Sequence, residues 1–235
     1  MIFEHYAPYA TAETMMGPSS LRILAELLDK HPLCLEAEDQ ILDLGCGTGL
    51  TTLALAKETG AKIMAADLWI KPEQNAPRFE TWGIGGQAAP VHADARQLPF
   101  ALKQFRAMVS VDAYHYFAGE EGFFAEKILP FLQNGAAVLV GIPGVKDAYE
   151  GRSEELLSAW LGDEAYMFKS PNHWRRIIGS HPRIESVESW EMNCFEEAWG
   201  DWFASGHRYA KGDREHFDTL IRPYTCFVGI HIRLR

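Results

Sequence analysis

The sequence predicts an α/β fold in which helices cover both faces of a doubly wound, mostly parallel sheet. Short apolar runs alternate with stretches of helical periodicity up to about residue 145, which is the pattern of successive strand–helix–strand units. The first of these runs ends in Asp43, and a glycine-rich turn follows it. The chain has 235 residues, a length that suits one α/β domain with additions at its edge.

The first part of the chain supplies five of the expected strands. Each is a short apolar run, and we place them at about 39–44, 61–66, 89–93, 105–112 and 136–142. Helices are expected at about 19–30, 49–58, 72–82 and 120–132. Ser19 is a candidate N-cap for the first helix, Pro77 is expected to break the 72–82 helix, and Pro143 to end the fifth strand.

Beyond about residue 150 the chain mixes charged and aromatic residues. We expect four more helices at about 153–161, 171–180, 195–205 and 213–221. Two more strands are expected at about 184–191 and 224–233, which brings the predicted sheet to seven strands. No repeat or low-complexity linker divides the chain, so we expect one domain over residues 1–235.

The composition argues against several classes of partner. A formal net charge of −10 disfavours nucleic acid, because phosphate contacts need a basic surface. No run reaches the ~18 apolar residues of a membrane span, and residues 1–6 lack the basic region of a signal peptide. We therefore expect no membrane partner. The four cysteines form no C-x-x-C pair, so we also expect no metal site and a cytoplasmic location.

The stretch Ile-Leu-Asp-Leu-Gly-Cys-Gly-Thr-Gly at 41–49 is the most informative part of the chain. A buried strand ends at Asp43, and glycines at alternate positions let the backbone pass close to a ligand. The G-x-G-x-G spacing differs from the G-x-G-x-x-G of dinucleotide folds, and no Lys-Ser or Lys-Thr pair follows. A carboxylate at this place repels phosphate and suits an ammonium group. A glycine-rich turn that binds nothing is the alternative.

The same stretch resembles the first motif of the class I methyltransferases that use S-adenosylmethionine (SAM). The resemblance implies a Rossmann-like seven-stranded sheet, mostly parallel, with one antiparallel strand near the C-terminus. It also implies that SAM is the cofactor, that S-adenosylhomocysteine (SAH) is the product, and that the loop holds the methionine end of SAM. The loop residues assigned to cofactor binding are Asp43, Gly45, Gly47 and Gly49.

Two further acids follow the second and third strands. Asp67 stands where a carboxylate accepts hydrogen bonds from both ribose hydroxyls, and Leu68 after it is a candidate wall for adenine. Asp94 precedes Leu-Pro-Phe at 98–100, which resembles the family's third landmark. The resemblance implies that Asp94 accepts from the adenine amine and that the Ala95 amide donates to a ring nitrogen. Turn aspartates without a ligand are the alternative at both places.

The fourth strand ends in a group of polar and aromatic side chains. It resembles the A-x-H-H-F end of small-molecule methyltransferases of the ubiquinone-biosynthesis kind, with His115 on the first histidine and Tyr116 in place of the second. His115 is a candidate general base, or else a structural histidine. We expect Asp112 to orient the cofactor or a cationic substrate. Tyr116 is a candidate catalytic residue, and Tyr114 is a candidate substrate-binding residue.

Segments on either side of the motif region are candidate parts of the acceptor pocket. The N-terminal segment, residues 1–30, resembles the lid of phosphoethanolamine methyltransferases, with Tyr6 as a catalytic and Tyr9 as a substrate-binding candidate. A tail that is disordered or packed on the surface is the alternative. An insertion at about 146–182 is expected on the substrate side, where His173 and Trp174 are pocket candidates. Core packing is the alternative for these aromatic residues.

These observations lead to the hypothesis of methyl transfer from SAM to a small-molecule acceptor, with a homodimer as a candidate assembly. A nucleotide-dependent oxidoreductase and a SAM-binding protein without turnover are the alternatives. Cyclopropanation of lipids is disfavoured, because the acidic chain shows no basic amphipathic helix for a membrane surface.

Overall fold

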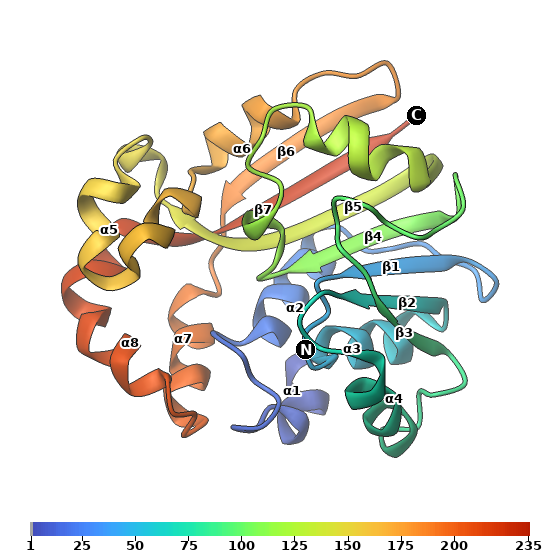
Figure 1. Cartoon of the computed structure of the whole chain (residues 1–235), viewed down its shortest axis with the longest axis horizontal. Helices are drawn as coiled ribbons and strands as arrows, with labels where there is room; N and C mark the ends of the chain where they lie inside the picture. Colours follow the sequence, from blue (N-terminus) through green and yellow to red (C-terminus); the bar gives the residue numbers. More distant parts are fainter. Residues whose placement is uncertain (1) are drawn as a thin grey trace.

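A computed structural model describes residues 2–235, and its centre is a seven-stranded sheet (Figure 1). The strands are β1 (Gln40–Leu44), β2 (Lys62–Asp67), β3 (Ala88–His92), β4 (Phe105–Val111), β5 (Leu132–Val145), β6 (Ile184–Glu191) and β7 (Thr225–Leu234). Their order is β3-β2-β1-β4-β5-β7-β6. The first five strands run parallel, and β7 runs antiparallel to β5 and β6. The predicted fold class is confirmed.

Helices cover both faces of this sheet. They are α1 (Ile2–Tyr6), α2 (Ser20–Lys30), α3 (Leu50–Thr59), α4 (Pro72–Thr81), α5 (Ser153–Leu161), α6 (Pro171–Ile178), α7 (Phe195–Ala204), α8 (Ala210–His216) and α9 (Arg222–Tyr224). Successive residues of β1 face opposite layers, as the strand pleat requires. Ile41 packs with residues of α2 and α3, and Leu42 belongs to a second core cluster that contains Trp174 of α6.

The carboxyl ends of the parallel strands meet at one end of the sheet. Figure 1 shows α5 and α8 beyond the arrowhead of β5, at this same end. In open α/β sheets this is the end at which ligands bind. No helix within residues 2–235 is long and apolar enough to cross a lipid bilayer.

Two prolines do not interrupt their elements as predicted. The break expected at Pro77 is absent, since α4 continues through it and the buried side chains of Asn75 and Phe79 hold its two halves in place. The end of β5 expected at Pro143 is also wrong. The strand continues to Val145, because β7 still pairs with it there and Pro143 stands opposite Phe227 in the register.

Helical segments also differ locally from the prediction. The regular helix expected over 120–132 is wrong, because a π-helical turn at Phe124–Ile128 gives way to a 3-10 turn at Leu129–Phe131, where Pro130 removes a backbone donor. The helix expected at 213–221 is divided between α8 and a π-helical turn at Phe217–Ile221. Ser19 does precede α2, but its buried hydroxyl caps nothing within the described chain.

Candidate active site

A cavity of about 410 Å³ lies at the carboxyl ends of β1, β2 and β4. The predicted site residues on its wall are Gly45, Gly47, Asp67, Leu68, Asp94, Ala95, Asp112 and Tyr116. The N-terminal segment before α2 closes one side with Thr14, Met15, Met16, Gly17 and Pro18. Residues far apart in the sequence therefore meet at the edge of the sheet where the motifs predict a ligand.

The loop after β1 needs its glycines for two different reasons. Gly45 has a φ of 76°, and a Cβ there would lie 2.2 Å from the Cβ of Ala113, so β1 and the end of β4 can approach closely. Gly49 has a φ of 92° and precedes α3, where a Cβ would lie 2.3 Å from Phe79 Cε1. Gly49 does not line the cavity and packs the loop on α4, and its expected contact with SAM stays a prediction.

Asp43 is fully buried beneath the loop and does not line the cavity. Its Oδ2 accepts hydrogen bonds from the hydroxyls of Thr51 at 2.9 Å and Thr52 at 2.6 Å. Burial raises the pKa of this carboxyl to about 6, although the two hydroxyls act in the opposite direction. Asp43 thus ties β1 to the first turn of α3. Its expected contact with the methionine end of SAM stays a prediction.

Asp67 lines the cavity and is held by backbone amides. Its Oδ2 accepts from the amide of Gly47 at 2.8 Å, and its Oδ1 accepts from the amides of Trp69 and Ile70, also at 2.8 Å. A carboxylate offers about four acceptor positions, so three amides leave room for a further donor. The end of β2 is therefore fixed against the glycine loop with its acid at the cavity.

Asp94 and Ala95 line the cavity after β3. Oδ1 of Asp94 accepts from the amide of Arg96 at 2.8 Å, and the guanidinium of Arg96 lies 3.5 Å from the same oxygen. Leu68 and Trp69 on the wall are 44% and 59% exposed, which leaves apolar surface open to a ligand. An acid, an amide and an apolar surface on one wall suit a purine ring.

Asp112 follows β4 in a backbone conformation that few non-glycine residues adopt, with a φ of 55°. It lines the cavity, and no residue within 2–235 donates a hydrogen bond to its carboxylate. Burial raises the pKa of this carboxyl to about 7, and the charge of Asp213 acts in the same direction. A residue with a strained backbone and a carboxyl pKa near neutrality is typical of functional sites.

The next three residues lie in different surroundings. Tyr116 lines the cavity, and burial together with the charges of Asp112 and Glu164 raises its pKa. His115 is 5% exposed and is not part of the cavity wall, and burial lowers its pKa to about 3. Tyr114 is buried and packs against Trp174 with 5.7 Å between ring centroids. Of the three, Tyr116 alone reaches the cavity.

The remaining candidates lie away from the cavity wall. The Tyr6 hydroxyl donates to Glu58 of α3 at 2.8 Å, and Tyr9 packs edge-on against Trp82. Trp174 is fully buried in the core, and a guanidinium nitrogen of Arg176 lies 3.1 Å from Nδ1 of His173 on the same helix. Contacts between any of these side chains and an acceptor stay predictions.

Several wall residues belong to no motif of the sequence. Met16 approaches from the N-terminal segment, whereas Glu164 and Met167 stand on the 3-10 turn after α5. The hydroxyl of Thr48 donates to the carbonyl of Thr14, which fastens the N-terminal segment to the glycine loop. The methionine pair at 15–16 before a small-residue turn was the available signal in that segment, whereas nothing in the sequence marks Glu164.

Residues 41–135 match the model of a family described as a methyltransferase domain. The match begins in β1 and ends in β5, so it includes the glycine loop and the acids that follow β2, β3 and β4. This part of the chain is therefore similar to a methyltransferase domain, as its motifs imply.

Solved structures share the fold over most of the chain. Phosphoethanolamine N-methyltransferase 2 of Haemonchus contortus is similar with a TM-score of 0.72 and 18% identity, over 94% of this chain and 54% of that one. Geranyl diphosphate C-methyltransferase of Streptomyces coelicolor A3(2) has a TM-score of 0.68 and 15% identity, over 89% and 78%. The cyclase SpnF has a TM-score of 0.69 and 15% identity, over 90% and 79%. At these identities the likeness shows the fold alone.

Proposed function

We propose that this protein transfers the methyl group of SAM to a small-molecule acceptor. The observation that carries the proposal is the arrangement of Asp67, Asp94 and Asp112 on one cavity beside the glycine loop. These acids follow or end three different strands, and the fold brings them together at the edge where α/β sheets bind ligands.

Each part of SAM has a matching group on the wall. In this proposal Asp67 accepts hydrogen bonds from the ribose hydroxyls, and Asp94 with the amide of Ala95 pairs with adenine. The methionine end lies along Gly45 and Gly47, where the backbone carries no side chain. SAM and the product SAH present the same ribose, adenine and amino-acid groups, so we expect both to bind.

The reaction is an in-line displacement at the methyl carbon. A lone pair of the acceptor forms the new bond to carbon while the bond from carbon to sulfur breaks, and SAH leaves with that electron pair. The sulfonium is already activated, so the protein mainly positions the acceptor, an effect worth up to ~7–11 kcal/mol in favourable models. A site that excludes water also strengthens the electrostatics around the sulfonium.

The charges on the wall favour a neutral or cationic acceptor. Asp112 and Glu164 both lie near Tyr116, where they raise its pKa. Arg96 is the one cationic side chain on the described wall, and it is paired with Asp94. A phosphorylated acceptor would therefore meet carboxylates without a free cation. We propose small amines first and phenols second, with Asp112 as the group that attracts or deprotonates the acceptor.

Two segments complete the proposed site. Residues 1–30 serve as a lid of the one domain, supported by the wall residues at 14–18 and by the hydrogen bond from Thr48 to Thr14. The insertion at about 146–182 supplies the acceptor side, supported by the presence of Glu164 and Met167 on the wall.

The test of this function is turnover. The purified protein is incubated with SAM and panels of small amines and phenols, and SAH is measured. We expect SAH to form with at least one amine and to fall at least about tenfold in Asp112→Asn, on the scale of a lost charged contact. Asp29→Asn, at an exposed acid of α2, is the matched control and is expected to leave turnover unchanged.

The two alternatives predict different results. A SAM-binding protein without turnover would bind SAM and form no SAH with any acceptor. An oxidoreductase would bind NADH, which a fluorescence titration detects. We expect no NADH binding, because an acid and a G-x-G-x-G loop offer no pyrophosphate site.

A further inference from the structure

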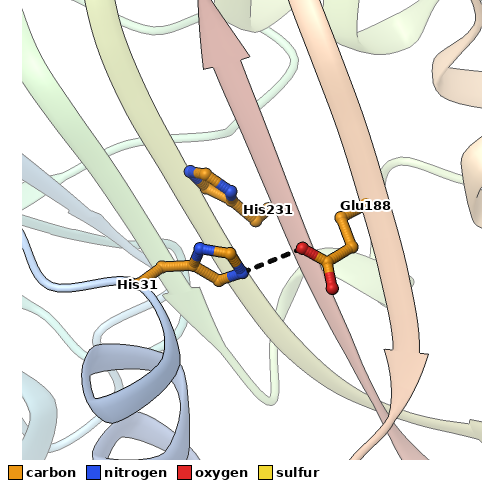
Figure 2. A group of neighbouring side chains, drawn as sticks. All are labelled: His31, Glu188 and His231. Carbon is orange, nitrogen blue, oxygen red and sulfur yellow. Dashed lines mark ion pairs between the residues drawn. The ribbon is translucent and has the colours of Figure 1, made fainter.

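Three side chains that the proposed reaction does not use converge on the outer part of the sheet. His31 follows the last residue of α2, Glu188 lies on β6 and His231 on β7, and none of them lines the cavity. Glu188 and His231 are direct partners in the antiparallel register of β6 and β7. Figure 2 shows the ring of His31 entering from its helix beside these two side chains.

The distances between the three groups are close to those of a metal centre. Nε2 of His31 lies 3.2 Å from Oε2 of Glu188, and the His31 and His231 rings stack with 3.8 Å between centroids. One potential ligand atom from each residue lies within 4.8 Å of the others. Ligands of a tetrahedral zinc ion with bonds of about 2.1 Å stand about 3.4 Å apart, so on binding the stacked rings of His31 and His231 would separate and turn one nitrogen each toward the ion.

The nitrogen that points to the carboxylate has an ion-pair contact in place of a regular hydrogen bond. Nε2 of His31 is shielded from solvent and lies 3.2 Å from Oε2 of Glu188, without the geometry of a hydrogen bond. The contact with the carboxylate therefore compensates only part of the hydration that this nitrogen loses. A cation between the nitrogen and the carboxylate would satisfy both atoms.

The three residues offer atoms of the right chemical type. Imidazole nitrogens and a carboxylate oxygen are donors that zinc accepts in proteins. The ammonium of Lys30 donates to Oε1 of Glu188 at 2.7 Å, which leaves Oε2 for the ion.

We propose that His31, Glu188 and His231 form a binding site for a divalent transition metal ion, with Zn²⁺ as the best match. Two imidazoles and one carboxylate are a ligand set that zinc accepts, and the fourth position would be held by water. The side chain of Glu188 is 46% exposed, so the ion can enter from solvent. The site would join the end of α2 to the β6–β7 pair. The spacing of the cysteines, which led us to expect no metal site, does not bear on this cluster.

Titration of the full, metal-free chain with Zn²⁺ by calorimetry tests this proposal. We expect one ion per chain with micromolar affinity, and at least about tenfold weaker binding in Glu188→Gln and in His231→Asn, the scale of effects at metal centres. His173→Asn changes a histidine of α6 that is hydrogen-bonded to Arg176 and is the control, with unchanged affinity expected. Zn²⁺ binding that neither Glu188→Gln nor His231→Asn weakens, or a Kd above about 100 μM, would overturn the proposal.

A second measurement guards against variants that fold poorly. Co²⁺ added to the wild-type chain is expected to give visible absorption bands of a four-coordinate ion, and Zn²⁺ is expected to displace it. The weak bands of a six-coordinate aqueous ion would contradict the site. Because both readouts need neither SAM nor an acceptor, their outcome is independent of the proposed methyl transfer.

Discussion

The carboxylate of Asp112 lies directly against the backbone of Gly17: a Cβ atom on Gly17 would come within 2.8 Å of Asp112 Oδ2. Gly17 belongs to the segment before α2, and Asp112 follows β4. The N-terminal segment therefore covers the strained carboxylate and helps to bury it. The contact joins the proposed lid to the proposed catalytic side of the cavity.

Gly17→Ala is expected to displace this carboxylate. The added methyl group has no room beside Asp112, so either the carboxylate or the segment at 14–18 must move. We expect kcat/KM to fall at least about tenfold, since displacements of about 1 Å in a positioned site cost this much or more. Steady-state kinetics measures the effect. Gly86→Ala, where a Cβ meets nothing within 4 Å, is the control, and equal activity of the two variants would refute the role of the contact.

The binding of SAM is expected to strengthen as pH rises through about 7. In the ligand-free protein burial raises the pKa of Asp112 to about 7, so its carboxyl is largely protonated at pH 6 and ionised at pH 8. A cationic ligand favours the ionised form, and its binding therefore releases a proton from Asp112. Calorimetry on either side of this pKa, in buffers of different ionisation enthalpy, measures both effects. In Asp112→Asn the pH dependence near neutrality should vanish, and its persistence would assign it to another group.

Asp67→Ala is expected to weaken SAM binding about tenfold or more, the scale of lost charge-assisted hydrogen bonds. The substitution removes the acceptor of the ribose hydroxyls and also frees the amides of Gly47, Trp69 and Ile70. Because those amides shape the loop, Asp67→Asn is the companion variant that keeps one oxygen and most of the shape. Calorimetric affinity for SAM that is unchanged in both variants would remove Asp67 from the site.

Asp43→Ala is expected to lower the stability of the folded protein. The carboxylate holds the hydroxyls of Thr51 and Thr52 in the buried interior, and its loss leaves two donors without a partner. The expected loss is about 1–3 kcal/mol in the free energy of unfolding, measured by urea denaturation. Asp29→Ala removes an exposed acid and should change little. A direct role in SAM binding would instead show as weaker affinity at undiminished stability.

His115→Phe separates the two roles that the motif leaves open for this residue. A general base at this position predicts a fall in kcat of about 10²–10⁴. His115 is buried, lies outside the cavity wall, and has a pKa lowered to about 3, so it is a weak proton acceptor. We therefore expect less than about tenfold change in kcat, with the phenyl ring packing beside Tyr116 and Phe168.

The sheet was predictable because its signals are local. Each strand is an apolar run of its own, and the alternation with helices indicates the parallel arrangement. The local features that differ from the prediction depend on contacts between residues far apart in the sequence. Pro77 stays inside α4 because Asn75 donates to the Gly47 carbonyl at 2.9 Å and Phe79 packs beneath Gly49, neither of which is visible in the local sequence.

The candidate site was predictable where a residue's place follows from a strand end. Asp67, Asp94 and Asp112 reach the cavity because the carboxyl ends of parallel strands share one edge. Asp43 comes from the same kind of strand, but the hydroxyls at 51–52 hold it in the interior. The positions of side chains outside the motif region could not be predicted in this way, because these residues do not follow the strands of that region. The residues of the proposed metal site come from positions 31, 188 and 231, so no spacing rule brings them together.

Calorimetry of the cofactor-free protein with SAM and with SAH is the most direct test of the proposed function. We expect both to bind with micromolar affinity and one molecule per chain, and NADH to produce no heat of binding. Failure of both SAM and SAH to bind would contradict a SAM-dependent methyltransferase, and the cavity beside the glycine loop would then belong to another ligand.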